Sequence, residues 1–180
     1  MGGDPGVGCG SAVSFDPRVI CRALNDHGVR YVVVGGFASV IHGSPLPTAD
    51  VDVVPSRSDA NLVRLAAALG ELGAQLRTAD GPVAALLDAE FLAAMPLMLN
   101  LVTDAGDLDV AFEPSGPRRG FSEWDADAAD VTIGEGLVVR VASLDAVIES
   151  KRAAGRLKDE RALPYLESLR DELDAEAEGS

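Results

Sequence analysis

The sequence predicts an α+β fold, in which one sheet has helices on one side and is followed by a helical pair. Three observations lead to this prediction. A β-branched run at 31–34 and an alternating run at 48–54 are typical of strands. Amphipathic helical segments alternate with these strands in the first half of the chain. From 97 to 142 the patterns are mostly those of strands, and two helical segments follow.

The composition indicates a single folded domain. The chain has 180 residues, 47% of them hydrophobic, and contains no run of about eighteen apolar residues, so we expect no membrane partner. Its start lacks a basic and apolar signal segment, which predicts a cytoplasmic protein. We expect a flexible tail over 1–14, one domain over 15–173 with its C-terminal helices at 143–173, and an acidic tail over 174–180.

The net charge of −14 is unusual for a protein that handles nucleic acid, because phosphate contacts need Lys or Arg. Local patches do the binding, however, and much of the acidity lies at 123–130 and in the last ten residues. Cys9 and Cys21 match neither a disulfide framework nor a metal motif.

The first predicted helix covers 16–27, with Asp16 as N-cap and Pro17 at its first position. Its buried stripe is predicted to be Val19, Ile20, Ala23 and Leu24.

A strand at 30–34, a short helix at 37–42 and a strand at 48–54 follow. Ser58 is predicted to cap a helix from Asp59 to Leu72.

The second half is predicted as a series of short elements. They are a strand at 74–77, a weakly helical segment at 82–95, a hairpin of strands at 97–103 and 108–112, a polar loop or short helix at 114–128, strands at 130–133 and 137–142, a helix at 144–154 capped by Ser143, and a last helix at 157–173 after Gly155.

The segment from 31 to 54 carries most of the candidate chemistry. Gly35 and Gly36 directly follow a buried strand, which predicts a tight turn where the backbone comes close to another group. Asp50 and Asp52 are two residues apart on a strand and therefore project from one face. Two such carboxylates repel each other unless a cation lies between them, and Mg²⁺ is a usual partner for oxygen ligands. The segment therefore predicts a metal site.

This order of Gly-Gly, thirteen further residues and Asp-Val-Asp-Val resembles the signature of the DNA polymerase beta-like nucleotidyltransferases. Within that superfamily the chain is similar to the minimal nucleotidyltransferases of the AbiEii/MenT toxin type, whose motif has Thr or Ser two residues before the first Asp. Thr48 occupies that position. The resemblance implies a nucleotidyltransferase-like mixed sheet and an enzyme that transfers a nucleotide monophosphate from an NTP.

The superfamily supplies a third carboxylate from a later strand. Asp109 is our candidate, because it lies between two apolar residues on a strand after a hairpin turn. Asp107 would share its face, but it follows Gly106 and is predicted to belong to the turn. Asp50, Asp52 and Asp109 would then hold two Mg²⁺ ions, with Mn²⁺ as an alternative, and Asp109 would help to activate the acceptor hydroxyl as a base.

An otherwise acidic chain concentrates five of its fifteen basic residues, including both lysines, between 151 and 161. The stretch from 150 to 159 resembles the family's S-K-x-x-x-x-R-x-K-D segment. The resemblance implies that Lys151 contacts the nucleotide phosphates as a catalytic residue, and that Lys158 and Asp159 complete the nucleotide-binding pocket.

A phosphate cradle is predicted from the backbone of Gly35 and Gly36 and the hydroxyl of Ser44. Leu46 departs from the family pattern, because members commonly carry a basic residue there. This leaves three basic residues as candidates for the missing phosphate contact, namely Arg57, Arg118 and Lys151.

The AbiEii/MenT resemblance implies that the acceptor is the 3′ end of tRNA, so that modification blocks aminoacylation and translation. It also implies a cognate antitoxin. Thr48 is counted among the nucleotide-binding residues and is the candidate for regulatory phosphorylation, since a phosphate there would place negative charge beside the carboxylates.

Two other functions stay open. One is adenylylation of a protein hydroxyl by a nucleotidyltransferase antitoxin, which suits an acidic surface. The other is a non-catalytic module that binds a nucleotide or a partner, which Leu46 favours and the complete carboxylate set disfavours.

Overall fold

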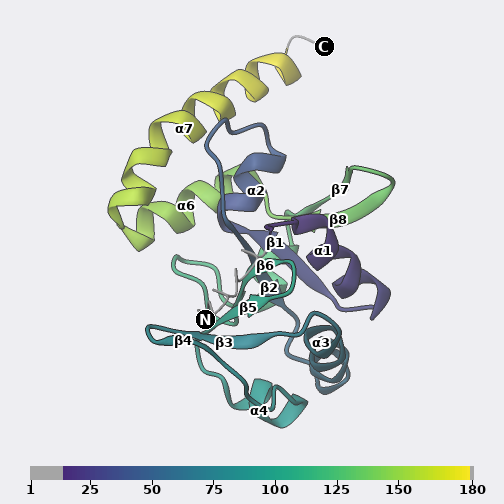
Figure 1. Cartoon of the computed structure of the whole chain (residues 1–180). Helices are drawn as coiled ribbons and strands as arrows, with labels where there is room; N and C mark the ends of the chain where they lie inside the picture. The colour runs from purple at the N-terminus through teal and green to yellow at the C-terminus, as the bar shows by residue number, and fades with distance from the viewer. Residues whose placement is uncertain (1–13, 179–180) are drawn as a thin grey trace, which may run out of the picture.

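The computed structural model describes residues 14–178 of the chain (Figure 1). Apart from residue 14, the tail predicted over 1–14 lies outside these residues, and so do the last two residues of the predicted acidic tail. The last helix continues to Glu178, beyond the end at Leu173 that the sequence predicts.

One mixed sheet of eight strands forms the centre of the described structure. The strands are β1 (Tyr31–Val34), β2 (Asp50–Pro55), β3 (Gln75–Thr78), β4 (Gly81–Val83), β5 (Met98–Thr103), β6 (Gly106–Ala111), β7 (Ala129–Ile133) and β8 (Leu137–Val141). Their spatial order is β4-β3-β5-β6-β2-β1-β8-β7. The pairs β1–β8 and β2–β6 are parallel, and the remaining neighbours are antiparallel.

Seven helices accompany this sheet within the described residues. They are α1 (Pro17–Asp26), α2 (Gly35–Ile41), α3 (Asp59–Glu71), α4 (Ala89–Ala94), α5 (Gly120–Asp125), α6 (Leu144–Ala154) and α7 (Leu157–Glu178). None of them has both the length and the apolar character that crossing a bilayer requires.

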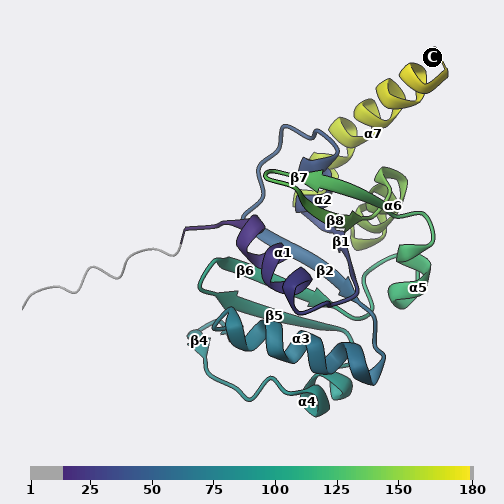
Figure 2. The same ribbon diagram turned by 90° about the vertical axis from the view of Figure 1, so that its right-hand side faces the viewer.

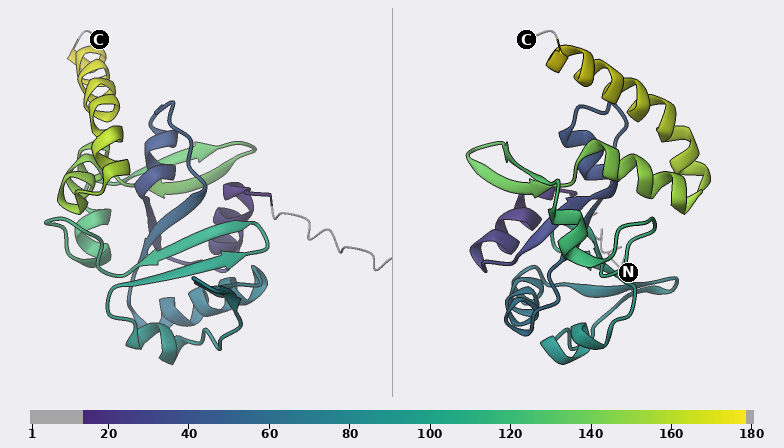
Figure 3. Two further views of the ribbon diagram at one scale, coloured as in Figure 1. Left: turned by 60° about the vertical axis from the view of Figure 1, so that its left-hand side comes forward. Right: turned by 180° about the vertical axis from the view of Figure 1, so that it is seen from behind.

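Helices cover both faces of the sheet, which corrects the prediction that they lie on one side. α1 and α3 pack together on one face (Figure 2). α6 and α7 lie across the sheet from them, next to α2 (Figure 3). Side chains alternate along β2, so Val51 and Val53 are completely buried on the α1–α3 side while Asp50 and Asp52 face α6 and α7.

The start of α1 follows the sequence signals closely, but its buried stripe is shifted. Asp16 is the N-cap, and its side chain accepts a hydrogen bond from the Arg18 backbone N–H at 3.0 Å. Val19, predicted to be buried, is 48% exposed, whereas Cys21 is completely buried. The burial of Cys21 agrees with its expected place as a small core residue, so only the prediction for Val19 is wrong, because the rotation of the helix on the sheet turns Val19 outward.

Three local predictions also need correction. Gly35 and Gly36 do not form a separate turn, because β1 passes directly into α2 at Gly35. Ser58 occupies the N-cap of α3 but makes no capping hydrogen bond with its side chain. The weakly helical segment 82–95 contains the end of β4 and the short helix α4.

Leu108 supports the strand that carries the third carboxylate, because it is completely buried on β6. We expect Leu108→Ala to lower the free energy of unfolding by about 2–5 kcal/mol, as it removes a packed side chain and leaves a cavity. Urea unfolding measures the change. Val138→Ala is the matched control on β8, where the side chain is 47% exposed, and a similar loss there would contradict the explanation.

Candidate active site

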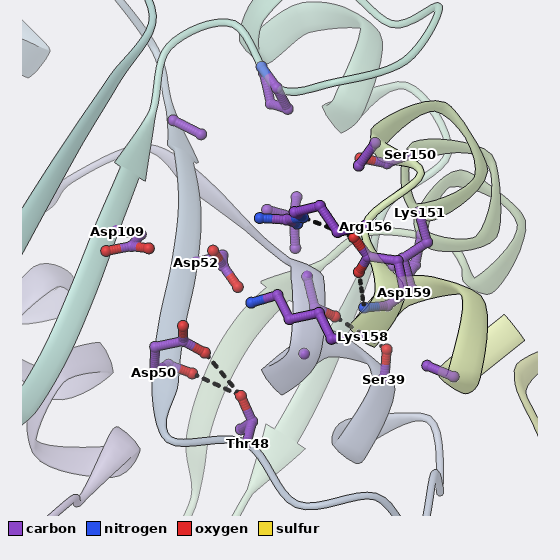
Figure 4. Close-up of a pocket in the computed structure, with 18 of the residues that line it drawn as sticks. Ser39, Thr48, Asp50, Asp52, Asp109, Ser150, Lys151, Arg156, Lys158 and Asp159 are labelled. Carbon is purple, nitrogen blue, oxygen red and sulfur yellow. Dashed lines mark hydrogen bonds and ion pairs between the residues drawn. The ribbon is translucent and has the colours of Figure 1, made fainter.

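A cleft of about 630 Å³ lies between the strands β1, β2, β5 and β6 and the helices α6 and α7 (Figure 4). All ten residues that the sequence analysis assigned to the carboxylate cluster, the phosphate cradle and the nucleotide-binding pocket line this cleft. They are Gly35, Gly36, Ser44, Thr48, Asp50, Asp52, Asp109, Lys151, Lys158 and Asp159. The cleft therefore brings together segments that are more than a hundred residues apart in the chain.

The carboxylates come from two adjacent parallel strands. Asp52 on β2 is paired in register with Asp109 on β6, and Asp50 precedes Asp52 on the same face. Asp50, Asp52 and Asp109 each offer one oxygen, and these three atoms lie within 4.8 Å of one another. The donor set fits a hard divalent cation such as Mg²⁺, because all donors are carboxylate oxygens close to the spacing that a shared ion requires.

The Gly35–Gly36 segment passes directly over these groups. A Cβ atom on Gly35 would overlap the carboxylate of Asp52, and one on Gly36 would lie 2.6 Å from Thr48 Oγ1. Gly35 also has a φ of +64°, in the region that favours glycine. The predicted close approach of the backbone therefore occurs, at the first residue of a helix.

Thr48 is attached to the first carboxylate. Its hydroxyl donates to Asp50 Oδ1 at 2.9 Å (Figure 4). This contact orients the Asp50 side chain toward the cleft, so any modification of the Thr48 oxygen would act directly on that carboxylate.

Burial and mutual repulsion change the proton affinities of the cluster. Burial, with the charges of Asp50 and Asp109, raises the pKa of Asp52 to about 6, although a hydrogen bond from the Gly36 backbone and the charge of Lys158 oppose this rise. Burial also raises the pKa of Asp109, against a hydrogen bond from Asn100 and the charge of Arg77. A nearby cation would therefore stabilise the charged form of both carboxyl groups.

Arg77 on β3 is a residue of the site that the sequence analysis missed. One of its terminal nitrogens contacts Asp107 Oδ2, and the other donates to Asp109 Oδ1 at 2.6 Å. Asp107 lies in β6 on the same face as Asp109, which corrects its assignment to the turn. Its carboxylate is outside the close cluster and is bound by Arg77 instead.

The opposite wall of the cleft is basic. Asp159 is buried between Lys151 Nζ at 3.1 Å and Arg156 Nε at 2.7 Å. Burial alone would raise the pKa of Asp159, but its hydrogen bonds to Arg156 and Lys151 hold the pKa below the usual value. The side chain of Lys158 forms no hydrogen bond or ion pair with a described residue. Its ammonium group points toward Asp52 and Asp50 (Figure 4).

Only one of the three candidates proposed to replace the missing basic residue at Leu46 reaches the cleft. Arg57 donates to the carbonyl oxygens of Met95 and Ala93, and Arg118 is paired with Asp127 and Glu149. Neither arginine lines the cleft, whereas Lys151 does. Lys158 and Arg156, from the same basic segment, are the further cations at this wall.

No protein-family model and no curated protein sequence matches the chain. Solved structures nevertheless match most of it. A Thermotoga maritima protein assigned as a nucleotidyltransferase has 15% identity and a TM-score of 0.52, with 88% of this chain and 90% of that chain covered. The lincosamide adenylyltransferase LnuA, with lincomycin bound, has 13% identity and a TM-score of 0.58, covering 87% and 99%. ANT(2″)-Ia, in complex with adenylyl-2″-tobramycin, has 14% identity and a TM-score of 0.53, covering 88% and 94%.

The chain has the nucleotidyltransferase fold. This confirms the nucleotidyltransferase-like mixed sheet and the C-terminal helices that the sequence predicted. The narrower resemblance to AbiEii/MenT toxins stays a prediction.

A substitution of Gly35 tests the close approach of the backbone to Asp52. We expect Gly35→Ala to abolish tight Mn²⁺ binding, measured by electron paramagnetic resonance, because the new methyl group displaces the Asp52 carboxylate. Gly136→Ala is the matched control, since Gly136 has a φ of +73° but no atom near the added Cβ. Both variants should lose about 1–2 kcal/mol of stability from backbone strain. Equal Mn²⁺ binding by the two variants would contradict the assignment.

The raised pKa of Asp52 predicts a pH-dependent stability. The folded state binds this proton more tightly than the unfolded chain, because the pKa is about 6 rather than 3.8. The wild-type protein in chelator should therefore lose stability as the pH rises from about 4 to 7, by roughly 2 kcal/mol more than Asp52→Asn. Urea unfolding at a series of pH values measures this difference, and parallel curves for the two proteins would contradict it.

Proposed function

We propose that the protein is a metal-dependent nucleotidyltransferase that transfers a nucleotide monophosphate from an NTP to a hydroxyl acceptor. The observation that carries this proposal is the carboxylate cluster of Asp50, Asp52 and Asp109 at ligand spacing in the cleft of a nucleotidyltransferase fold. In this proposal Asp50, Asp52 and Asp109 would hold two Mg²⁺ ions, with Mn²⁺ as an alternative. The ions supply charge neutralisation at the attacking and leaving oxygens during in-line displacement.

The charges of the cleft suit a nucleotide triphosphate. Four acidic and four basic side chains line it and balance each other. Two divalent ions would add four positive charges, which match the roughly four negative charges of an NTP. The cleft alone is therefore neutral, and it becomes complementary to the triphosphate once the ions are bound.

Phosphate binding is assigned to groups that line the cleft. The Lys158 side chain reaches into the cleft without a hydrogen-bond or ion-pair partner among the described residues, and we assign it the main charged contact. The Ser44 hydroxyl and the backbone at Gly35 and Gly36 add neutral contacts. Lys151 acts from its pair with Asp159, which fixes its ammonium group at the wall.

The chemical step is a substitution at the α-phosphorus. The acceptor oxygen forms a bond to that phosphorus, the bond to the oxygen bridging the α- and β-phosphates breaks, and pyrophosphate leaves. The proton of the acceptor hydroxyl passes to Asp109, which we assign as the carboxylate nearest the acceptor.

We propose the 3′ end of tRNA as the acceptor, with a block of aminoacylation and translation as the result. The resemblance of the Thr48-to-Val53 motif and of the 150–159 segment to AbiEii/MenT toxins supports this choice. The same resemblance supports a cognate antitoxin as the partner of this protein. Phosphorylation of Thr48 would inactivate the enzyme, because the phosphate would stand beside Asp50, to which the hydroxyl now donates.

A second acceptor class is favoured by the acidic character of the chain. The net charge of −14 repels a polyanion such as tRNA but attracts a cationic small molecule or a basic protein surface. Two of the structural neighbours, by their names, are an antibiotic adenylyltransferase with lincomycin bound and a protein in complex with adenylyl-2″-tobramycin. A hydroxyl-bearing antibiotic or a protein hydroxyl is therefore the alternative acceptor.

Transfer of label tests the proposal. Purified protein with Mg²⁺ and each α-labelled NTP should label one of three offered acceptors, namely total tRNA, a protein extract, or a mixture of tobramycin and lincomycin. Asp52→Asn should lower the rate by at least about a hundredfold, because it removes one of the three carboxylates that would hold the metal.

Asp130→Asn is the control, since Asp130 is a β7 carboxylate outside the cleft. Label in tRNA supports the toxin, and label in an antibiotic or a protein supports the second acceptor class. Unchanged transfer by Asp52→Asn would contradict the site assignment. NTP binding without any transfer would favour a non-catalytic module.

A further inference from the structure

Arg77 forms an ion pair with a proposed metal ligand, which is unexpected for a site that should receive cations. Its guanidinium group spans two carboxylates, Asp107 and Asp109, which are neighbours on one face of β6. The Asp109 side chain is only 11% exposed, and one of its two oxygens is already taken by Arg77. The arginine therefore neutralises part of the carboxylate cluster from within the protein.

The sheet holds Arg77 in this position from outside the carboxylate-bearing strands. β3 pairs with β5, and β5 pairs with β6, so Arg77 reaches across the strand that carries Asn100. Its side chain is 31% exposed, which places the charge at the rim of the cleft rather than in bulk water. A cation in this partly buried position acts more strongly on nearby ions than an exposed one.

We propose that Arg77 is a built-in counter-cation that competes with divalent metal for Asp109 and thereby sets the metal affinity of the site. The inference rests on the proposed metal site. A bound ion would use Asp109 as a ligand, and Asp107 would keep the guanidinium group of Arg77 beside the cluster. The positive charge of Arg77 then opposes the bound ion.

The consequence is a link between metal and nucleotide. Because the charged side chains of the cleft already balance, metal alone adds uncompensated positive charge. A triphosphate that binds together with the metal neutralises this excess positive charge. Arg77 thus favours joint binding of metal and nucleotide over binding of metal alone.

Mn²⁺ binding to the nucleotide-free protein, followed by electron paramagnetic resonance, tests the inference. Arg77→Gln should bind Mn²⁺ about tenfold more tightly than the wild type, because a unit positive charge a few ångströms from the ion is removed. Arg77→Lys, which keeps the charge, should stay within about threefold of the wild type. Equal or weaker binding by Arg77→Gln would overturn the inference.

Arg140→Gln is the matched control. Arg140 also holds two carboxylates, Asp125 and Asp130, and its side chain is 36% exposed, but it does not line the cleft. Its loss should leave Mn²⁺ binding unchanged, and the same tenfold gain there would overturn the inference by pointing to a general charge effect. Melting temperatures in chelator confirm that each variant is folded.

The proposed function is tested separately in the same experiment. If wild type and Asp52→Asn bind Mn²⁺ equally weakly, the metal site itself is refuted. If the wild type binds Mn²⁺ and Asp52→Asn does not, the metal site stands, and the comparison of Arg77→Gln with the wild type decides the inference alone.

Discussion

Repulsion among three carboxylates is the constraint that the rest of the structure accommodates. The parallel pairing of β2 with β6 places Asp52 beside Asp109, and the alternation along β2 adds Asp50 to the same face. Burial and this repulsion raise the pKa of Asp52 to about 6, which is unfavourable for the fold near neutral pH. The fully buried side chains on the opposite face of β2, Val51 and Val53, help to hold the strand in place despite that cost.

The cations of the site answer this repulsion from two directions. Arg77 approaches from the β3 side of the sheet and is bound to the third carboxylate. Lys158 approaches from α7 and remains without a partner among the described residues. Lys151 and Arg156 form ion pairs with the buried Asp159. These two cations therefore add positive charge to the α6–α7 side of the cleft without pairing with the carboxylate cluster. Lys158 is therefore the cation of this wall that the proposed function assigns to the triphosphate.

The fold and the site constrain the binding of the nucleotide more strongly than the binding of the acceptor. In the proposed function, the carboxylates, glycines and lysines around the cleft all serve the metal and the triphosphate. The acceptor contacts whatever surface adjoins the cleft, and that surface varies between proteins of one fold. The fold alone therefore does not decide among the three acceptors proposed above, namely tRNA, a protein and an antibiotic.

The sequence by itself determined the elements whose signals are local. The cap of α1, the β5–β6 hairpin, the close approach at Gly35 and the common face of Asp50 and Asp52 follow from residue types and the period of a strand. Tertiary structure decided whatever depends on how elements pair. A short strand such as β3 does not reveal which neighbour its face meets, so the contact of Arg77 with Asp109 became visible only in the folded sheet. For the same reason Arg57 and Arg118 were plausible phosphate ligands by charge alone, and the packing of the chain directed both of them elsewhere.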